Sequence, residues 1–328
     1  MWYLKKYKAI AYLPTVYTLL QYYLLEPCKM EETLFLIDST FPAKIVQRML
    51  ETIKTDFSFL YNSRTSALKI RIYSFLNPKT PVYLGSDLLC TNLFLRYMTE
   101  VYYLEDGVGS YELVYQKEKQ VIQRNESMLR RWLYGDLYPW HGLADNVKKI
   151  YLTGILPIPE IIANKVELID LQSLWQQKNA QQKENILKLF LPEDFDKNLL
   201  TNYEILLLTQ PFSEDSFGSF SELDKIEVYR KLLSSYDESK VLIKVHPRET
   251  TDYSYYFPKI RILQTACPME LLMLLGFSVK KAISINSTAI FNLGSSVEKI
   301  ISGYDVTPAL EKEAKRRGIY EGISNKQK

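Results

Sequence analysis

The chain has 328 residues, 47% hydrophobic and 24% charged, a balance typical of a globular protein with room for two domains. A formal net charge of +3, without a sustained basic stripe, argues against nucleic-acid binding. Three widely spaced cysteines indicate free thiols in a reducing compartment, and two histidines far apart in the chain argue against a histidine-based metal site.

Hydropathy and aromatic content bear on localisation. The sequence has no apolar run of the kind that a signal peptide or a membrane span needs, so we expect a cytoplasmic protein. The aromatic and basic stretch Arg130–Trp140 has two interpretations. It is either a surface loop that contacts a membrane or a glycan, which would make the protein peripheral on the inner face of the cell membrane, or a loop whose tryptophans cover a sheet edge.

In the first half, short apolar runs alternate with segments of helical period. Strands are predicted at Ala9–Leu13, Thr33–Ile37, Phe57–Tyr61, Val82–Gly85 and Glu100–Leu104. Helices are predicted at Val16–Leu25, Pro42–Ile53, Ala67–Leu76 and Thr91–Tyr97. This β–α alternation indicates a doubly wound sheet.

After two further strands at Lys149–Thr153 and Val166–Leu171, the polar stretch Gln172–Asn198 predicts a solvated helix and a linker. The alternation then restarts. Strands follow at Ile205–Leu208, Val241–Val245, Ile260–Leu263, Lys281–Ile285 and Ile300–Ser302, and helices at Ser221–Ser235, Pro268–Leu275 and Ala309–Arg317. We predict an α/β protein with two Rossmann-like domains facing across a cleft: residues 1–185, a linker at 186–200, residues 201–305, and a terminal helix at 306–328.

One predicted core strand ends at a corner that carries a histidine and an arginine. The run from Val241 to Val245 stops at His246-Pro247-Arg248, because Pro247 donates no ladder hydrogen bond. Open α/β sheets bind ligands at the carboxyl ends of their strands. A histidine beside an arginine suits a phosphate, although a capped turn with a surface salt bridge explains the same residues.

A second strand ends in Ser284-Ile285-Asn286-Ser287-Thr288-Ala289. Hydroxyl and N–H groups at a strand-to-helix turn can hold an anion, and an ordinary helix cap is the plainer interpretation. The sequence has neither G-x-G-x-x-G nor a Walker lysine pattern, which disfavours dinucleotide and ATP sites of those classes.

Two acidic strand ends complete the candidates. Pro211-Phe212-Ser213-Glu214-Asp215 follows one strand and Glu105-Asp106-Gly107 follows another. A carboxylate there can act as a general base, while a solvated loop and a tight turn are the bland alternatives. Asp194-Phe195-Asp196 matches a D-x-D pattern but lies in the polar linker, so we interpret it as solvated acid.

In order and spacing, acid-acid-Gly at 105–107, His246-Pro247 and the turn at Ser287-Thr288 resemble the bacterial sialyltransferases of glycosyltransferase family 52, the lipooligosaccharide and capsule type. The resemblance covers Glu100 to Ser302. It implies a GT-B fold and a CMP-sialic acid donor, with no metal or other cofactor.

The resemblance also implies residue roles. His246 would contact the donor phosphate and assist the departure of CMP, Ser287 and Thr288 would bind the same phosphate, and Glu270 would grip the cytidine ribose. The general base is expected at Asp215 first, with Glu214 and Asp106 open. The other residues expected to bind substrate are Glu105, Gly107, Pro247, Arg248, Ser284 and Asn286.

The predicted activity is an inverting, metal-independent transfer of sialic acid to a terminal galactose of a bacterial surface glycan, with an α-2,3 linkage expected. Two alternatives stay open: a GT-B glycosyltransferase that uses another nucleotide sugar, and a non-catalytic protein of polysaccharide assembly. The expected partners are the donor and the glycan acceptor, and homodimerisation stays open.

Overall fold

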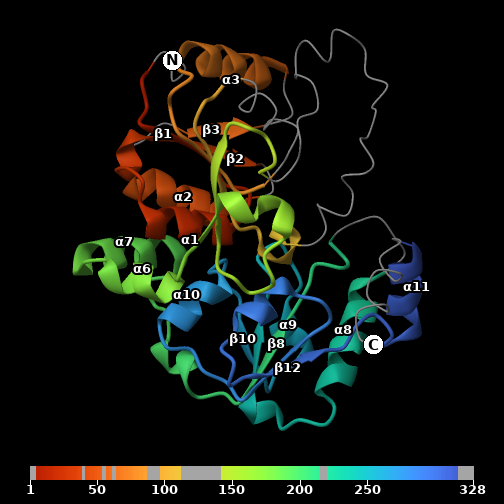
Figure 1. The fold of residues 1–328 in the computed structure, drawn as a ribbon. Coiled ribbons are helices and arrows are strands. Elements are labelled where there is room, and N and C mark those ends of the chain that lie inside the picture. The colour runs from red at the N-terminus through yellow and green to blue at the C-terminus, as the bar shows by residue number, and fades with distance from the viewer. Residues whose placement is uncertain are drawn as a thin grey trace. The chain divides into compact units, whose positions relative to one another are not determined.

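The structure is a computed structural model that describes residues 5–38, 41–53, 57–60, 64–86, 97–111, 142–214 and 220–316. The chain divides into two compact units, Met1–Leu189 and Phe190–Lys328 (Figure 1). Each unit is built on its own parallel sheet flanked by helices. The aromatic stretch Arg130–Trp140 and nearly all of the helix predicted at Thr91–Tyr97 lie outside the described residues.

The sheet of the N-terminal unit has seven parallel strands in the order β3-β2-β1-β4-β5-β6-β7. They are β1 (Ala9–Tyr12), β2 (Thr33–Asp38), β3 (Phe57–Leu60), β4 (Val82–Leu84), β5 (Val101–Leu104), β6 (Val147–Leu152) and β7 (Val166–Leu168). The order reverses between β1 and β4. In doubly wound sheets such a reversal opens a crevice at the carboxyl ends of the strands, where ligands bind.

Helices follow the strands of this unit in turn. They are α1 (Val16–Leu25), α2 (Ala43–Thr52), α3 (Arg64–Leu76), α6 (Leu171–Gln177) and α7 (Ala180–Phe190), with 3-10 turns η2 (Met30–Glu32), η3 (Gly107–Ser110) and η4 (Glu160–Lys165). Thr15 and Thr18 form a capping box that starts α1 directly after β1. Since α1 is buried along almost its whole length, its polar side chains have to find partners inside the protein.

The sheet of the C-terminal unit has five parallel strands in the order β10-β9-β8-β11-β12. They are β8 (Ile205–Leu208), β9 (Val241–Lys244), β10 (Arg261–Leu263), β11 (Lys281–Ser284) and β12 (Glu298–Ile301). The helices are α8 (Glu222–Leu233), α9 (Tyr253–Tyr256), α10 (Met269–Leu274) and α11 (Pro308–Arg316), with 3-10 turns η5 (Lys197–Leu200), η6 (Glu238–Lys240) and η7 (Thr288–Asn292). Here the order reverses between β8 and β11.

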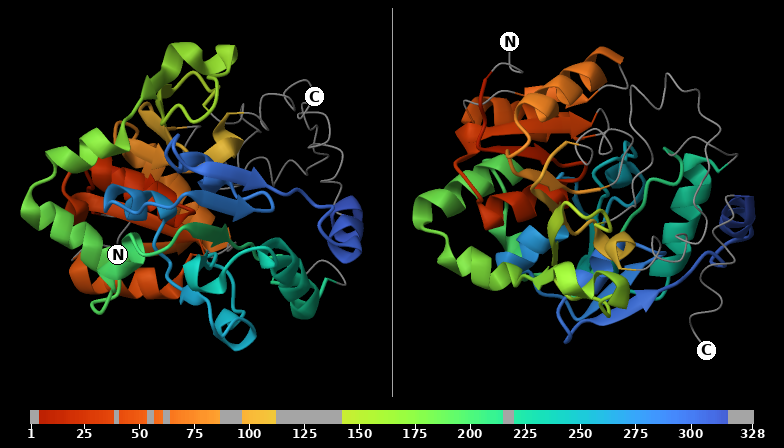
Figure 2. Two further views of the ribbon diagram at one scale, coloured as in Figure 1. Left: turned by 90° about the horizontal axis from the view of Figure 1, so that it is seen from below. Right: turned by 45° about the horizontal axis from the view of Figure 1, so that its top comes forward.

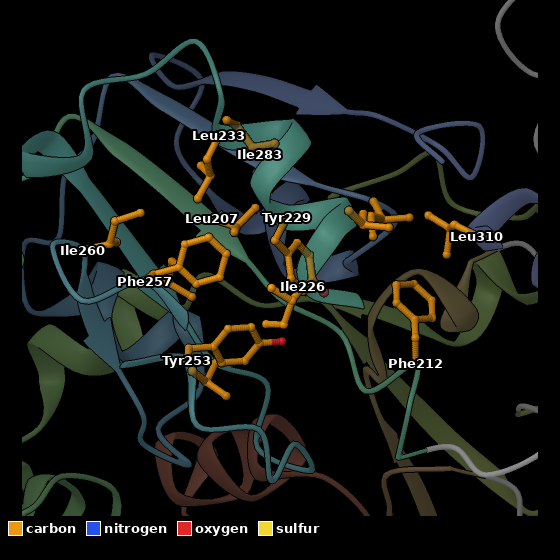
Figure 3. Packing of buried hydrophobic residues seen from close by; sticks show 14 of the residues in the cluster. Leu207, Phe212, Ile226, Tyr229, Leu233, Tyr253, Phe257, Ile260, Ile283 and Leu310 are labelled. Carbon is orange, nitrogen blue, oxygen red and sulfur yellow. The ribbon is translucent and has the colours of Figure 1, made fainter. Parts of the chain in front are cut away.

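One face of this second sheet is covered by α8 and α11, which lie side by side in both views of Figure 2. Ser221 and Asp224 form the capping box that starts α8. Alternate residues of the strands, such as Leu207 and Ile283, pack with Tyr229 in one apolar cluster (Figure 3). The sheet is therefore held from this side by a continuous core that ends near the carboxyl ends of the strands.

The α/β fold predicted from the sequence is confirmed, and the strands predicted on apolar runs are found with small shifts at their ends. Two segments differ. The stretch predicted as a solvated helix and linker forms α6, α7 and η5, and the residues after β11 form the 3-10 turn η7 in place of an α-helix. The shortness of η7 weakens the macrodipole argument for an anion site there.

Gly85 follows β4 at the reversal point and offers a test of this packing. A Cβ added there would lie 2.7 Å from the Thr18 Cγ2 and 2.8 Å from the Pro14 Cδ. We expect Gly85→Ala to lower the free energy of unfolding by about 1–3 kcal/mol. Gly109→Ala is the matched control, because its Cβ would meet no atom within 4 Å. Urea denaturation measures both, and equal stability of the two variants would contradict the packing described.

Candidate functional site

In the N-terminal unit, the first acid after β5 is an internal anchor. Glu105 has no exposed surface. Its carboxylate accepts hydrogen bonds from the hydroxyls of Tyr17 (3.0 Å) and Tyr111 (2.6 Å) and from the N–H (2.6 Å) and hydroxyl of Thr153. Its backbone is held by the Gln21 amide, which accepts from the Glu105 N–H and donates to its carbonyl. Glu105 thus ties β5 to α1, η3 and the end of β6, and its oxygens are turned to the protein.

The second acid, Asp106, has the opposite environment. It is half-buried, and its carboxylate accepts a long hydrogen bond from the Thr15 hydroxyl, at 3.5 Å. The pKa of Asp106 is raised to about 6, mainly by burial; the Thr15 contact opposes the rise and the neighbouring Glu105 charge adds to it. Gly107 follows with a φ of 68°, a conformation that side-chain-bearing residues rarely adopt. A carboxylate with such a pKa suits proton transfer near neutral pH.

In the C-terminal unit, the corner after β9 is a tight turn from His246 to Glu249. The Glu249 N–H donates to the His246 carbonyl at 3.0 Å, with Pro247 and Arg248 at the two central positions. Proline is favoured at the first of these positions because its φ is already set. The Arg248 N–H donates to the His246 Nδ1 at 3.2 Å. The imidazole therefore braces its own turn through one nitrogen.

This bond also sets the protonation of His246. Because Nδ1 accepts a backbone N–H, the neutral ring carries its proton on Nε2. Burial, together with the charges of Arg248 and Lys244, lowers the pKa of His246 to about 3. At neutral pH the ring is uncharged and offers an Nε2–H donor. An arriving phosphate would favour protonation of this ring, since its negative charge offsets the neighbouring cations.

Beneath the corner, Glu249 is the centre of a buried network, and its side chain has no exposed surface. It accepts from the His246 N–H at 3.2 Å, from the Lys225 ammonium at 3.0 Å and from the hydroxyls of Thr209 and Tyr253. Thr209 in turn accepts from the His246 N–H at 3.0 Å. The network joins the ends of β8 and β9 to α8 and α9, so it fixes the direction in which His246 leaves the sheet.

Glu214 belongs to the same network. It accepts from the Lys225 ammonium at 2.8 Å and from the Thr250 N–H at 3.1 Å. Burial alone would raise the pKa of Glu214, but the bonds from Lys225 and Thr250 outweigh it and hold the pKa below its usual value. A carboxylate held ionised in this way is a weak proton acceptor. Asp215, the first choice for the base from the sequence, lies outside the described residues.

The turn after β11 is built from the residues expected to hold phosphate. Ser284 is buried and its hydroxyl accepts the Ser287 N–H at 2.8 Å. The Asn286 side chain is held by Gln210 and Tyr304, and its N–H donates to the Gln210 Oε1 at 3.1 Å. Ser284 and Asn286 therefore shape the turn from within.

At the end of this turn, by contrast, Ser287 is half-buried and Thr288 is exposed. The Ser287 side chain caps no N–H of η7. Since β11 and β9 both flank β8, the turn and the His246 corner leave the same edge of the sheet.

Glu270, near the start of α10, is buried and accepts a hydrogen bond from the Asn292 amide of η7. Lys244, the one charged residue of β9, reaches the same side of the sheet. Its ammonium donates to the carbonyls of Val245 (3.0 Å) and Thr265 (2.9 Å). Burial lowers the pKa of Lys244 to about 8, while Cys267 and Glu270 act against the change. Lys244 thus supports the loop that leads to Glu270.

In the network beneath His246, Thr209, Lys225 and Glu249 were not singled out from the sequence. Glu249 directly follows His246-Pro247-Arg248, and its spacing of three residues from that histidine is the signal that could have revealed a closed turn. Lys225 lies on a different element, and only the fold brings it to Glu249.

Three further observations bear on the expectations from the sequence. Within the described ranges, no group of three or more His, Cys, Asp or Glu side chains is arranged to hold a metal ion. Asp196 of the D-x-D stretch caps η5 by accepting the Asn198 N–H at 2.9 Å, and Asp194 is exposed. In the part of the chain that the structure describes, no helix is both long and apolar enough to span a membrane.

Comparison with known proteins assigns these features to a family. The model of glycosyltransferase family 52 matches residues 29–310. This range contains every strand except β1, and it also contains Glu105-Asp106 and the turn from His246 to Glu249. The chain belongs to glycosyltransferase family 52. An uncharacterized protein of Haemophilus influenzae (strain Rd) is 37% identical over 215 residues, and this match spans 65% of each chain.

Solved structures show the fold of this family 52 chain. The α/β-galactoside α-2,3-sialyltransferase of Photobacterium phosphoreum has a TM-score of 0.55 at 13% identity, covering 97% of this chain and 99% of that one. The GT-B domain of a Photobacterium damselae sialyltransferase has a TM-score of 0.58 at 13% identity, covering 95% and 97%. The expected GT-B fold is confirmed.

The buried network makes a stability prediction. Lys225→Met would leave Glu214 and Glu249 without their shared cation, so we expect a loss of about 3–5 kcal/mol in the unfolding free energy. Lys280→Met removes an exposed partner of Glu204 and should cost less than about 1 kcal/mol. Urea denaturation of the two variants measures the difference. Comparable small losses would show that Lys225 does not neutralise the buried acids.

Proposed function

We propose that this chain is an inverting, metal-independent sialyltransferase, which moves sialic acid from CMP-sialic acid to a terminal galactose of a bacterial surface glycan. The protein would act in the cytoplasm. Its acceptor would be a capsule or lipooligosaccharide precursor, and the linkage formed would be α-2,3. Membership of family 52 supports the reaction class, and the likeness in fold to two bacterial sialyltransferases agrees with it.

The observation that carries the proposal is the contrast between Glu105 and Asp106. These neighbouring acids at one strand end have different environments. Glu105 is held by internal hydrogen bonds, and Asp106 is half-buried with its pKa raised to about 6. Such a separation of two titratable groups is typical of acid–base catalysis. We assign Asp106 as the general base that accepts the proton of the acceptor hydroxyl.

The leaving group would be handled by the C-terminal unit. As the acceptor oxygen bonds to the anomeric carbon, the bond from that carbon to the CMP phosphate oxygen breaks and the electron pair stays with the phosphate. The Nε2–H of His246 would donate to this phosphate, and the hydroxyls of Ser287 and Thr288 would bind it from β11. Glu270 would bind the ribose. Attack opposite to the leaving phosphate inverts the anomeric centre.

The charge of the donor supports independence from a metal. CMP carries a single phosphate, so the negative charge that develops on departure is smaller than in a nucleoside diphosphate. Hydrogen bonds from His246 and the two hydroxyls, beside Arg248, are a sufficient set of donors for one phosphate. The proposed chemistry therefore needs a base and donors, and no Lewis acid.

The test is CMP release from CMP-sialic acid with lactose as acceptor in the presence of EDTA. We expect turnover in the wild type and a loss of about a hundredfold or more in His246→Ala. His246→Asn is the matched variant, because its carbonyl oxygen can accept the Arg248 N–H and its amide retains a donor, so it should lose less.

Two results would overturn the proposal: full turnover in His246→Ala, or no release of CMP while a UDP- or GDP-sugar is consumed. Mass spectrometry of the product on a panel of galactosides gives the linkage.

A further inference from the structure

Helix α3 carries an apolar stripe on its outer side. Leu68, Ile72, Phe75 and Leu76 are exposed by 44%, 43%, 67% and 59%. Their spacing places all four on one face of the helix. The opposite face, with Ile70 and Tyr73, is buried in the core of the N-terminal unit. The helix is therefore apolar on two sides, and only one of these sides is used in folding.

In the described part of the chain, no other element carries such a row of exposed large hydrophobic residues. The other exposed large hydrophobic residues are spread over α2, η4, β7, α8 and α9, and they are Leu50, Ile161, Leu168, Leu223 and Tyr255. Single exposed apolar residues need no explanation, but a contiguous row marks a surface that binds something.

Specific contacts anchor α3 on both sides. Tyr97 packs edge-on against Phe75, with ring centroids 5.8 Å apart, and accepts hydrogen bonds from the Arg71 guanidinium at 3.1 and 3.2 Å. On the buried side, the Tyr73 hydroxyl accepts the Tyr7 N–H at 3.1 Å. Figure 1 shows α3 on the side of its sheet opposite to α1 and α2. The exposed side chains therefore lie on a helix that is anchored to its own unit.

The sequence of α3 and its flanking residues carries charges of one sign. Between Asp56 and Asp87 the chain has no acidic residue, and its basic residues there are Arg64, Lys69, Arg71 and Lys79. The segment that contacts Tyr73 adds Lys5 and Lys6, both exposed. Leucine, isoleucine and phenylalanine flanked by lysine and arginine form the composition of helices that lie in the surface of anionic bilayers.

The charge distribution decides between two occupants. In a symmetric dimer a patch meets its own copy, so the basic residues of α3 would face each other and repel. An anionic lipid surface attracts the same residues while its acyl boundary accepts the apolar row. We propose that the α3 surface, defined by Leu68, Ile72, Phe75 and Leu76 with Lys69 and Lys79, docks the protein on an anionic membrane.

The experiment uses the full chain and sedimentation with vesicles. One set is phosphatidylcholine, and the other contains roughly a third phosphatidylglycerol. We expect binding to the anionic set, weakened by salt, and a loss of about tenfold or more in the partition coefficient of the double variant Ile72→Ser/Phe75→Ser. Lys69→Glu/Lys79→Glu should weaken binding to the anionic vesicles in the same direction.

The matched control is Leu223→Ser/Tyr255→Ser, which removes exposed apolar side chains from α8 and α9 and should bind like the wild type. Circular dichroism confirms that each variant is folded, and light scattering gives its mass. Equal binding of wild type and Ile72→Ser/Phe75→Ser would overturn the proposal. So would a wild-type dimer that becomes a monomer in that variant without any vesicle binding, which would make the face a protein interface. Neither outcome depends on the proposed transferase activity.

Discussion

A carboxylate buried in a protein has to be matched by donors or by a cation, and this constraint shapes both candidate corners. In the C-terminal unit, Glu249 gathers a lysine, two hydroxyls and the His246 N–H around one side chain without exposed surface. In the N-terminal unit, Glu105 gathers two tyrosines and Thr153. Removing either acid would leave these donors buried without a partner, so each network holds several elements in one arrangement.

The same constraint separates structural from reactive groups. The anchored acids take up the strong donors, and the groups next to them, Asp106 and His246, remain at the edge of each sheet. Their pKa values move away from their usual ranges in opposite directions, because burial disfavours the charged form of each. An uncharged imidazole that presents Nε2–H and a carboxylate that takes up a proton near pH 6 are suited to different halves of a transfer reaction.

Parallel sheet topology explains why these corners occur where they do. Both sheets reverse their order once, between β1 and β4 and between β8 and β11. In the first, Thr15 and Asp106 lie near the reversal; in the second, the ends of β8, β9 and β11 carry Gln210, His246 and Ser287. Gly85 is closely packed near the reversal in the first sheet, since a side chain there would displace α1.

Much of this was accessible from the sequence. Apolar runs located the strands, because a strand buried on both faces needs apolar residues throughout, and proline after histidine marked the end of β9. The roles of Glu105 and Asp106 were not accessible, because adjacent residues at a strand end point to opposite sides and distant tyrosines decide which side is closed. Lys225 was missed for the same reason: a lysine in the first turn of a helix is ordinarily solvated, and only tertiary contacts bury it.

The central claim is that Asp106, whose neighbour Glu105 takes up the internal hydrogen-bond donors, is the general base of the reaction. The measurement that tests it most directly is kcat/KM for transfer from CMP-sialic acid as a function of pH, in the wild type and in Asp106→Asn. The account predicts a rate that rises with pH through about 6, as the carboxyl loses its proton, and a loss of about a hundredfold or more in the variant together with that rise. Wild-type turnover in Asp106→Asn with the same pH dependence would contradict it and assign the base to another acid.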